Sequence, residues 1–122
     1  MKQIGESFEE ESRILKTLAH PARLAILELL RNGDHCVCHM EAALGYRQAY
    51  ISQHLMLLRD AGLVSVRREG WNIYYHVIKP EVFEIIDKVY QLTNRDVDHT
   101  EHFEMIETCT CPRCQVVKHP NH

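Results

Sequence analysis

The chain has 122 residues, with 14 Lys and Arg against 17 Asp and Glu, and a formal net charge of −3. This length suits one compact domain, and the share of apolar residues, 45%, is sufficient for a core. No apolar run is long enough to span a membrane, and the first residues lack the apolar stretch of a signal peptide, so we expect a cytoplasmic protein. In that compartment the five cysteines are expected to be reduced, which indicates metal binding or regulated oxidation.

Helical periodicity alternates with turn signals along most of the chain. Pro21 suits the first turn of a helix, Gly33 ends that helix, and Asp34 is placed to cap the next one. Apolar residues at helical spacing predict five helices, over residues 6–19, 21–31, 37–45, 48–62 and 79–103. The third and fourth of these helices, joined by a short turn, are typical of a helix-turn-helix.

Between the fourth and fifth helices the apolar period changes to that of a β-strand. Residues 63–69 and 72–78 alternate as strands around a turn, which predicts a β-hairpin. A helix-turn-helix followed by a hairpin is the winged-helix architecture. The expected fold is therefore mainly α with one small β-hairpin.

The charge of the chain is unevenly distributed. Residues 6–11 are acidic, whereas residues 47–79 carry five Arg and Lys against two Asp and Glu, a local charge of +3. In a winged helix the second helix of the pair enters the major groove, where Gln, Ser and Ala read bases and Arg contacts phosphates. The expected DNA contacts are Arg47, Gln48, Ala49, Tyr50, Ser52, Gln53, His54, Arg59, Arg67 and Arg68. The alternative is a solvated polar helix beside a purely structural hairpin.

Three motifs stand out: LAHPARLAIL near the start, SQHLMLLRDAGLV in the fourth helix, and REG followed by two tyrosines in the hairpin. Together they resemble the ArsR/SmtB family of metal-responsive repressors, over residues 12–90. The resemblance implies a homodimer, packed through its first and last helices, that represses an operator and releases it when an effector binds. The apolar stripe on the last helix supports dimerisation, because one small domain does not cover it.

The loss of periodicity near the end divides the chain into two regions. Residues 1–95 are expected to form the winged-helix DNA-binding and dimerisation domain, and residues 96–122 the helix end and a Cys/His-rich tail. Trp71, at the hairpin tip, departs from the arginine-rich tip that is commoner in the family. We expect Trp71 to contact DNA by packing on a sugar. The alternative is that it packs on the hairpin.

Cys36 and Cys38 lie two residues apart in the segment DHCVCHME. Residues at this spacing do not share a helix face, so the two thiols converge only where the backbone is extended or enters a helix. Thiols at helix N-termini favour the thiolate that binds metal. A CVC here lies in the metal site of the family that the chain resembles, and thiolates select soft ions such as As(III), Cd(II), Pb(II) or Zn(II). The alternative is two small buried residues.

Two thiolates are too few for these ions, which take three or four ligands. The remaining cysteines are Cys109, Cys111 and Cys114, and the last two have the chelating spacing C-x-x-C. We expect the tail to complete a mixed sulfur site with Cys36 and Cys38, within one subunit or across the dimer. The alternatives are a separate chelate in the tail, or tail cysteines with no regulated role.

A second candidate metal site uses His99 and His102, at i and i+3 on the predicted last helix. Zinc-sensing relatives carry an additional acid and histidine earlier on that helix. Here Ile86 and Lys88 occupy those positions, and Asp87 is out of step. The histidine site is therefore the weaker of the two hypotheses.

The sequence predicts a repressor that binds double-stranded operator DNA as a homodimer and dissociates when a soft ion binds its cysteines. One alternative keeps the fold and makes the cysteines a redox switch. Another is a winged helix used only for protein contacts, which would show no salt-dependent DNA affinity. Enzymatic activity is disfavoured, because the C-x-x-C follows no strand of a βαβ unit and the chain has no glycine-rich phosphate loop.

Overall fold

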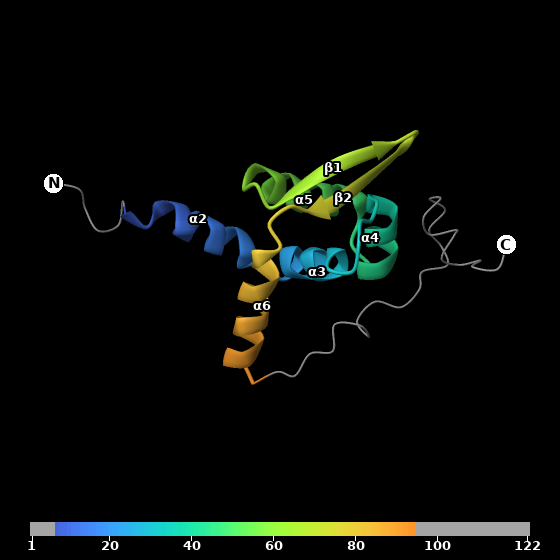
Figure 1. Cartoon of the computed structure of the whole chain (residues 1–122). Helices are drawn as coiled ribbons and strands as arrows, with labels where there is room; N and C mark the ends of the chain where they lie inside the picture. The colour runs from blue at the N-terminus through green and yellow to red at the C-terminus, as the bar shows by residue number, and fades with distance from the viewer. Residues whose placement is uncertain (1–6, 95–122) are drawn as a thin grey trace.

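Seven helices and strands follow one another along residues 7–94, the part of the chain that the computed structural model describes. They are α2 (Glu9–Leu18), α3 (Pro21–Leu30), α4 (Val37–Leu44), α5 (Gln48–Asp60), β1 (Val64–Glu69), β2 (Asn72–Val77) and α6 (Glu81–Leu92). Five helices and a two-stranded antiparallel hairpin form the predicted winged helix-turn-helix (Figure 1). None of these helices is both long and apolar enough to cross a bilayer.

The body of the molecule consists of α3, α4 and α5 with the hairpin packed on them, while α2 and α6 extend away from it in different directions (Figure 1). Its core is made by side chains that the three helices direct inward. Ile26 and Leu27 from α3, Met40 from α4, and Leu55 and Leu58 from α5 are at most 1% exposed. Burial of each such side chain stabilises the fold by about 1.5–3 kcal/mol, so this cluster fixes how the helix pair is held.

Local capping signals explain where α3 begins and α4 ends. His20 precedes α3 in an extended conformation, and its Nδ1 accepts a hydrogen bond from the amide of Ala22 at 3.1 Å. Pro21 then occupies the first helical position, as predicted. Gly45 ends α4 with a φ of 75°, which a residue with a side chain adopts only with strain.

Two boundary predictions were wrong. Asp34 does not cap α4; Cys36 is the N-cap residue, and the Asp34 carboxylate accepts a hydrogen bond from Arg67. The last helix, predicted to reach residue 103, ends at Leu92, because Asn94 takes the left-handed conformation with a φ of 56°. The proposed division at residue 95 stays a prediction, because the structure describes nothing beyond residue 94.

The hairpin pairs β1 with β2 in a register that runs from Val64 opposite Val77 to Glu69 opposite Asn72. Gly70, with a φ of 60°, and Trp71 form the turn at its tip. Tyr74 of β2 is 1% exposed and anchors the hairpin in the core. The tip therefore projects from a fixed base.

Candidate functional site

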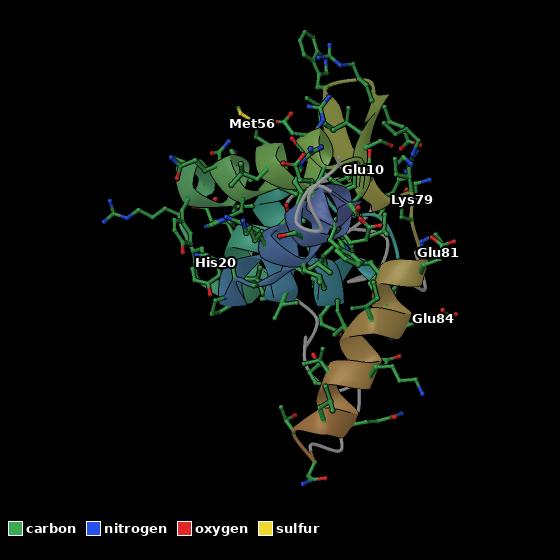
Figure 2. All side chains as sticks on the ribbon, turned by 90° about the vertical axis from the view of Figure 1, so that its left-hand side faces the viewer. Glu10, His20, Met56, Lys79, Glu81 and Glu84 are labelled. Atoms are coloured by element: carbon green, nitrogen blue, oxygen red, sulfur yellow. The ribbon has the colours of Figure 1, made fainter. Side chains whose placement is uncertain are left out.

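The outer side of α5 presents a row of accessible side chains, as the sequence predicted. The N-cap of the helix and its first turn are exposed, and an arginine lies near its C-terminal end. The exposed members of the predicted set are Arg47, Gln48, Ala49, Tyr50, Gln53 and Arg59, and Ser52 is half-buried. Met56, on the same helix, is 62% exposed and points away from the molecule (Figure 2).

His54 was predicted to contact DNA from this face, and the structure contradicts that exposure, because the side chain is 6% exposed. Its Nδ1 accepts a hydrogen bond from Nε of Arg23 at 3.2 Å. Its ring lies against those of His20 and Tyr50, with centroids 4.4 Å and 4.5 Å away. Burial, with the nearby His20 and Arg23, lowers the pKa of His54. His54 is therefore an internal link between α5 and the start of α3, where Figure 2 marks His20.

The sequence did contain a signal for this burial. Residues 51, 54, 55 and 58 have the i, i+3, i+4, i+7 spacing of one helix face, and Ile51, Leu55 and Leu58 are all buried. Because histidine is polar, His54 was predicted to lie on the exposed face of α5 rather than on this buried face.

The hairpin carries the remaining predicted DNA contacts. Arg68 is exposed, and Trp71 at the tip is 101% exposed, so it does not pack on the hairpin. Arg67 instead forms ion pairs within the protein. Its guanidinium is paired with Glu69 and lies 3.2 Å from a carboxylate oxygen of Asp34. The hydrogen bond with Asp34, together with the charge of Glu69, raises the pKa of Arg67.

The thiols of Cys36 and Cys38 meet at the start of α4. Cys36 has the extended conformation of an N-cap residue (φ −86°, ψ 166°), and Cys38 follows in the first helical turn. Their Sγ atoms are 2.9 Å apart, which confirms the convergence expected where the chain enters a helix. Cys36 is buried and Cys38 is exposed, so a ligand reaches the pair from the side of Cys38.

The surroundings of the thiol pair contain two imidazoles. The rings of His35 and His39 are stacked, with centroids 4.2 Å apart and planes within 6° of each other. Within residues 7–94, no three His, Cys, Asp or Glu side chains are grouped so that they could hold a metal ion. A metal held by both thiols would therefore need further ligands from the rest of the chain or from a second subunit. Cys109, Cys111 and Cys114, which were predicted for this purpose, lie outside the described residues, as do His99 and His102.

On α6, the positions where zinc-sensing relatives carry the earlier acid and histidine have other roles. Ile86 is a core residue, 3% exposed, and Asp87 is hydrogen-bonded to Arg31 at 2.9 Å and 3.2 Å. Arg31 also contacts Glu28 at 2.7 Å. Burial by itself lowers the pKa of Arg31, but the carboxylates of Asp87 and Glu28 outweigh it, so the pKa is raised.

An open apolar groove of about 350 Å³ lies between α2 and α6, and Leu24 of α3 also lines it. Several large apolar side chains on these helices are exposed, including Leu15 at 56%, Val89 at 47% and Leu92 at 82%. The residues that line the groove are Leu15, Leu18, Ala19, Leu24, Ile85, Ile86, Val89 and Tyr90. Of the apolar stripe predicted on the last helix, Ile85, Val89 and Leu92 are exposed, whereas Val82 and Ile86 are buried in the core.

Comparisons of the chain with known proteins agree on one family. Residues 20–66 match the bacterial regulatory protein family arsR. The biofilm growth-associated repressor of Agrobacterium fabrum is 41% identical over 83 residues, which cover 68% of this chain and 71% of that protein. The chain belongs to the arsR family.

Two further similarities bear on this arsR-family chain. The arsenical resistance operon repressor of Staphylococcus xylosus is 34% identical over 88 residues, which cover 72% of this chain and 84% of that protein. A homodimeric winged helix-turn-helix DNA-binding domain from Mycobacterium bovis has a TM-score of 0.65 and 28% identity, covering 80% of this chain and 97% of that domain. The family consists of transcriptional regulators, which confirms the predicted fold and the expectation that the chain is not an enzyme.

Proposed function

We propose that this protein is a homodimeric repressor that releases its operator when a soft metal or metalloid ion binds the thiolates of Cys36 and Cys38. One observation carries the proposal: the two Sγ atoms lie 2.9 Å apart at the start of α4, the first helix of the helix-turn-helix. An ion that pulls on this turn acts directly on the helix that supports α5. Thiolates select As(III), Cd(II), Pb(II) and Zn(II) among the available ions.

DNA binding in this proposal uses α5 in the major groove and the hairpin on the backbone. Gln48 and Gln53, exposed on α5, are placed to read base edges, while Ala49 and Ser52 lie beside them. The exposed Arg47, Arg59 and Arg68 are assigned to phosphates, which set affinity and register rather than sequence. Tyr50 and Trp71 supply flat side chains for contact with sugar or base, and Arg67 approaches a phosphate only in competition with Asp34.

The ion requires at least a third ligand, which we assign to the tail cysteines Cys109, Cys111 and Cys114. The similarity to an arsenical resistance operon repressor supports a soft metalloid or metal as the effector. The absence of a third ligand among residues 7–94 is consistent with a donor from the tail or from the second subunit.

Dimerisation is assigned to the apolar groove between α2 and α6. Its exposed side chains are apolar on both helices, and a second copy of the chain would remove them from water. The homodimeric Mycobacterium bovis domain, which shares the fold, supports a pair of subunits. The two copies of α5, related by a twofold axis, then face successive half-sites of an operator.

Operator binding measured by fluorescence anisotropy under reducing conditions tests the proposal. Arsenite, Cd(II), Pb(II) and Zn(II) are titrated against wild type, the double variant Cys36→Ser/Cys38→Ser, a chain ending at Glu107, and Glu41→Gln as a control on the exposed side of α4. We expect release in wild type and Glu41→Gln but not in the double variant. Release by the same ions in the double variant would overturn the thiol assignment.

The truncated chain separates the sources of the third ligand. Loss of release in this chain assigns the ligand to the tail, whereas retained release leaves Cys36 and Cys38 with other partners. Release by Zn(II) alone, surviving both changes, would move the site to His99 and His102.

A redox switch is the second candidate function, because the same 2.9 Å separation brings the two sulfurs close enough to react. Hydrogen peroxide would take two electrons and two protons from the thiols, leaving one disulfide and two water molecules. Operator release by peroxide in metal-free buffer, reversed by dithiothreitol and absent in the double variant, would favour this function over ion sensing.

A further inference from the structure

The segment that carries the thiols is attached to the hairpin. The amide of His35 donates to the carbonyl of Tyr75 at 3.2 Å, and the amide of Tyr75 donates back at 2.8 Å. This two-bond bridge makes the residue before Cys36 a short antiparallel neighbour of β2. Beside it, a carboxylate oxygen of Asp34 accepts a hydrogen bond from Nη2 of Arg67 on β1 at 3.2 Å. Backbone and side chain thus connect residues 34–35 to both strands.

Arg67 occupies a central position in the hairpin. It lies opposite Tyr74 in the strand register, and its guanidinium carbon is 5.2 Å from the centre of that buried ring. On its other side it is ion-paired with Glu69, the last residue of β1 before the tip. Arg67 therefore connects Asp34 to the core and to the end of the strand that leads to Trp71.

On the other side of the thiols, the chain leads back to α3 through Gly33. This glycine has a φ of 143°, in a region that residues with side chains rarely adopt, and it separates Arg31, the C-cap of α3, from Asp34. Asp34 and Cys36 are two residues apart, so their Cα atoms are separated by at most about 7 Å. A displacement of Cys36 is therefore passed to Asp34, with the glycine as the joint about which the segment turns.

We propose that Asp34 and Arg67 form a positioning pair that transmits ligand binding at Cys36 and Cys38 to the wing, which is the hairpin of β1 and β2. This inference rests on the proposed function and adds the route by which the thiols act on DNA. An ion bound by both thiolates at about 2.3 Å would set the two sulfurs about 3.8 Å apart, wider than their 2.9 Å separation here, so the N-cap turn of α4 moves and Asp34 moves with it. The ion pair with Arg67 then pulls β1, and the hairpin meets the DNA backbone at a different angle.

The Asp34–Arg67 pair also affects whether the charge of the Arg67 guanidinium can reach a phosphate. Asp34 and Glu69 hold the Arg67 guanidinium, whose side chain is 41% exposed, on the protein rather than on a phosphate. Movement of Asp34 changes how far this guanidinium reaches from the strand. Position and charge of the wing thus both depend on the segment that precedes the thiols.

Three measurements on the full chain test the pair, with Cd(II) as the probe. Absorbance from thiolate-to-metal charge transfer reports Cd(II) binding. Fluorescence emission reports a change at the wing, because Trp71 is the chain's only tryptophan. The ratio of operator Kd values with and without Cd(II) gives the coupling between the two sites. In wild type we expect Cd(II) to change Trp71 emission without DNA and to raise Kd by about 5- to 150-fold. In Asp34→Ala we expect wild-type absorbance, no Trp71 response, and a Kd ratio of about 2 or less, partly restored in Asp34→Glu.

Arg68→Gln is the matched control, because Arg68 lies next to Arg67 on β1 and forms no ion pair within the described residues. Loss of this phosphate contact should weaken operator binding by the same factor with and without Cd(II), which leaves the ratio unchanged. A wild-type ratio in Asp34→Ala would overturn the inference. So would Cd(II) absorbance in wild type without any Trp71 change, even if Asp34→Ala does not fold. Absence of Cd(II) absorbance or of release in wild type would instead overturn the proposed function, and the inference with it.

Discussion

Arg31, at the end of α3, holds Asp87 of α6 through two hydrogen bonds of 2.9 Å and 3.2 Å. The same guanidinium lies 4.6 Å from the ring centre of Phe83, one turn earlier on α6. The helix assigned to the dimer interface is thereby fixed to the body that carries the helix pair. Figure 2 shows this helix running away from the body, and Val82 and Ile86, in its first two turns, are buried in the core.

We expect the two ends of this ion pair to differ in their effect on stability. Asp87→Ala removes hydrogen bonds at a side chain that is 42% exposed, and should lower the free energy of unfolding by about 1–2 kcal/mol. Arg31→Met also leaves the Glu28 carboxylate, 7% exposed, without this cation, and should cost about 3 kcal/mol. Urea unfolding at fixed subunit concentration measures both.

Glu84→Ala, on the exposed part of α6 (Figure 2), is the control and should stay within about 0.5 kcal/mol of wild type. Equal losses for Asp87→Ala and Arg31→Met would contradict a role for Arg31 in compensating Glu28.

Acidification should destabilise the fold through His54. Burial holds the pKa of His54 below its ordinary value of 6.5 in the folded chain, so the unfolded chain takes up the proton first as pH falls. The contribution is therefore fully present above about pH 6.5 and is lost as pH falls through the lower folded pKa. We expect the drop in Tm between pH 7.5 and pH 5.5 to be smaller in His54→Gln than in wild type. The same drop in both proteins would show that another group governs the acid response.

Substitution of Val89 should weaken the dimer. Val89 lines the apolar groove and is 47% exposed, so a glutamine there would bury an amide in the proposed interface. An unsatisfied buried polar group costs about 1–3 kcal/mol, so we expect Val89→Gln to raise the dimer dissociation constant at least about fivefold for each buried amide. Sedimentation equilibrium measures this constant. Lys88→Gln, at the exposed neighbouring position, should leave it unchanged, and equal effects of the two changes would place the interface elsewhere.

Two substitutions on α5 should separate affinity from sequence preference. Arg59→Gln is expected to weaken binding to all DNA sequences alike and to reduce the salt slope by about 1 per contact, because a phosphate contact is lost. Gln53→Ala is expected to relax discrimination at one base pair by about 1–3 kcal/mol, with the salt slope unchanged. Anisotropy titrations at several KCl concentrations, with operator and single-base variants, measure both effects. A change of salt slope in Gln53→Ala would assign that side chain to the backbone instead.

The sequence predicts the order and type of the elements, because helix and strand periods are local signals that recur over a few residues. It also determined that Cys36 and Cys38 converge, since their spacing permits this only where a helix begins, and α4 begins there. The missing half of the histidine site on α6 was likewise readable from residue identities alone.

Which polar side chains pair depends on contacts between elements that are distant in the sequence. Arg31 and Asp87 are 56 positions apart, and Asp34 and Arg67 are 33 apart, so no local pattern distinguishes these partners from other charges. The burial of His54 depends on tertiary contacts in the same way, since Arg23, 31 positions away, donates the hydrogen bond that its Nδ1 accepts. The physical reason is common to all three: packing of distant helices and strands chooses among partners that the chain itself leaves equivalent.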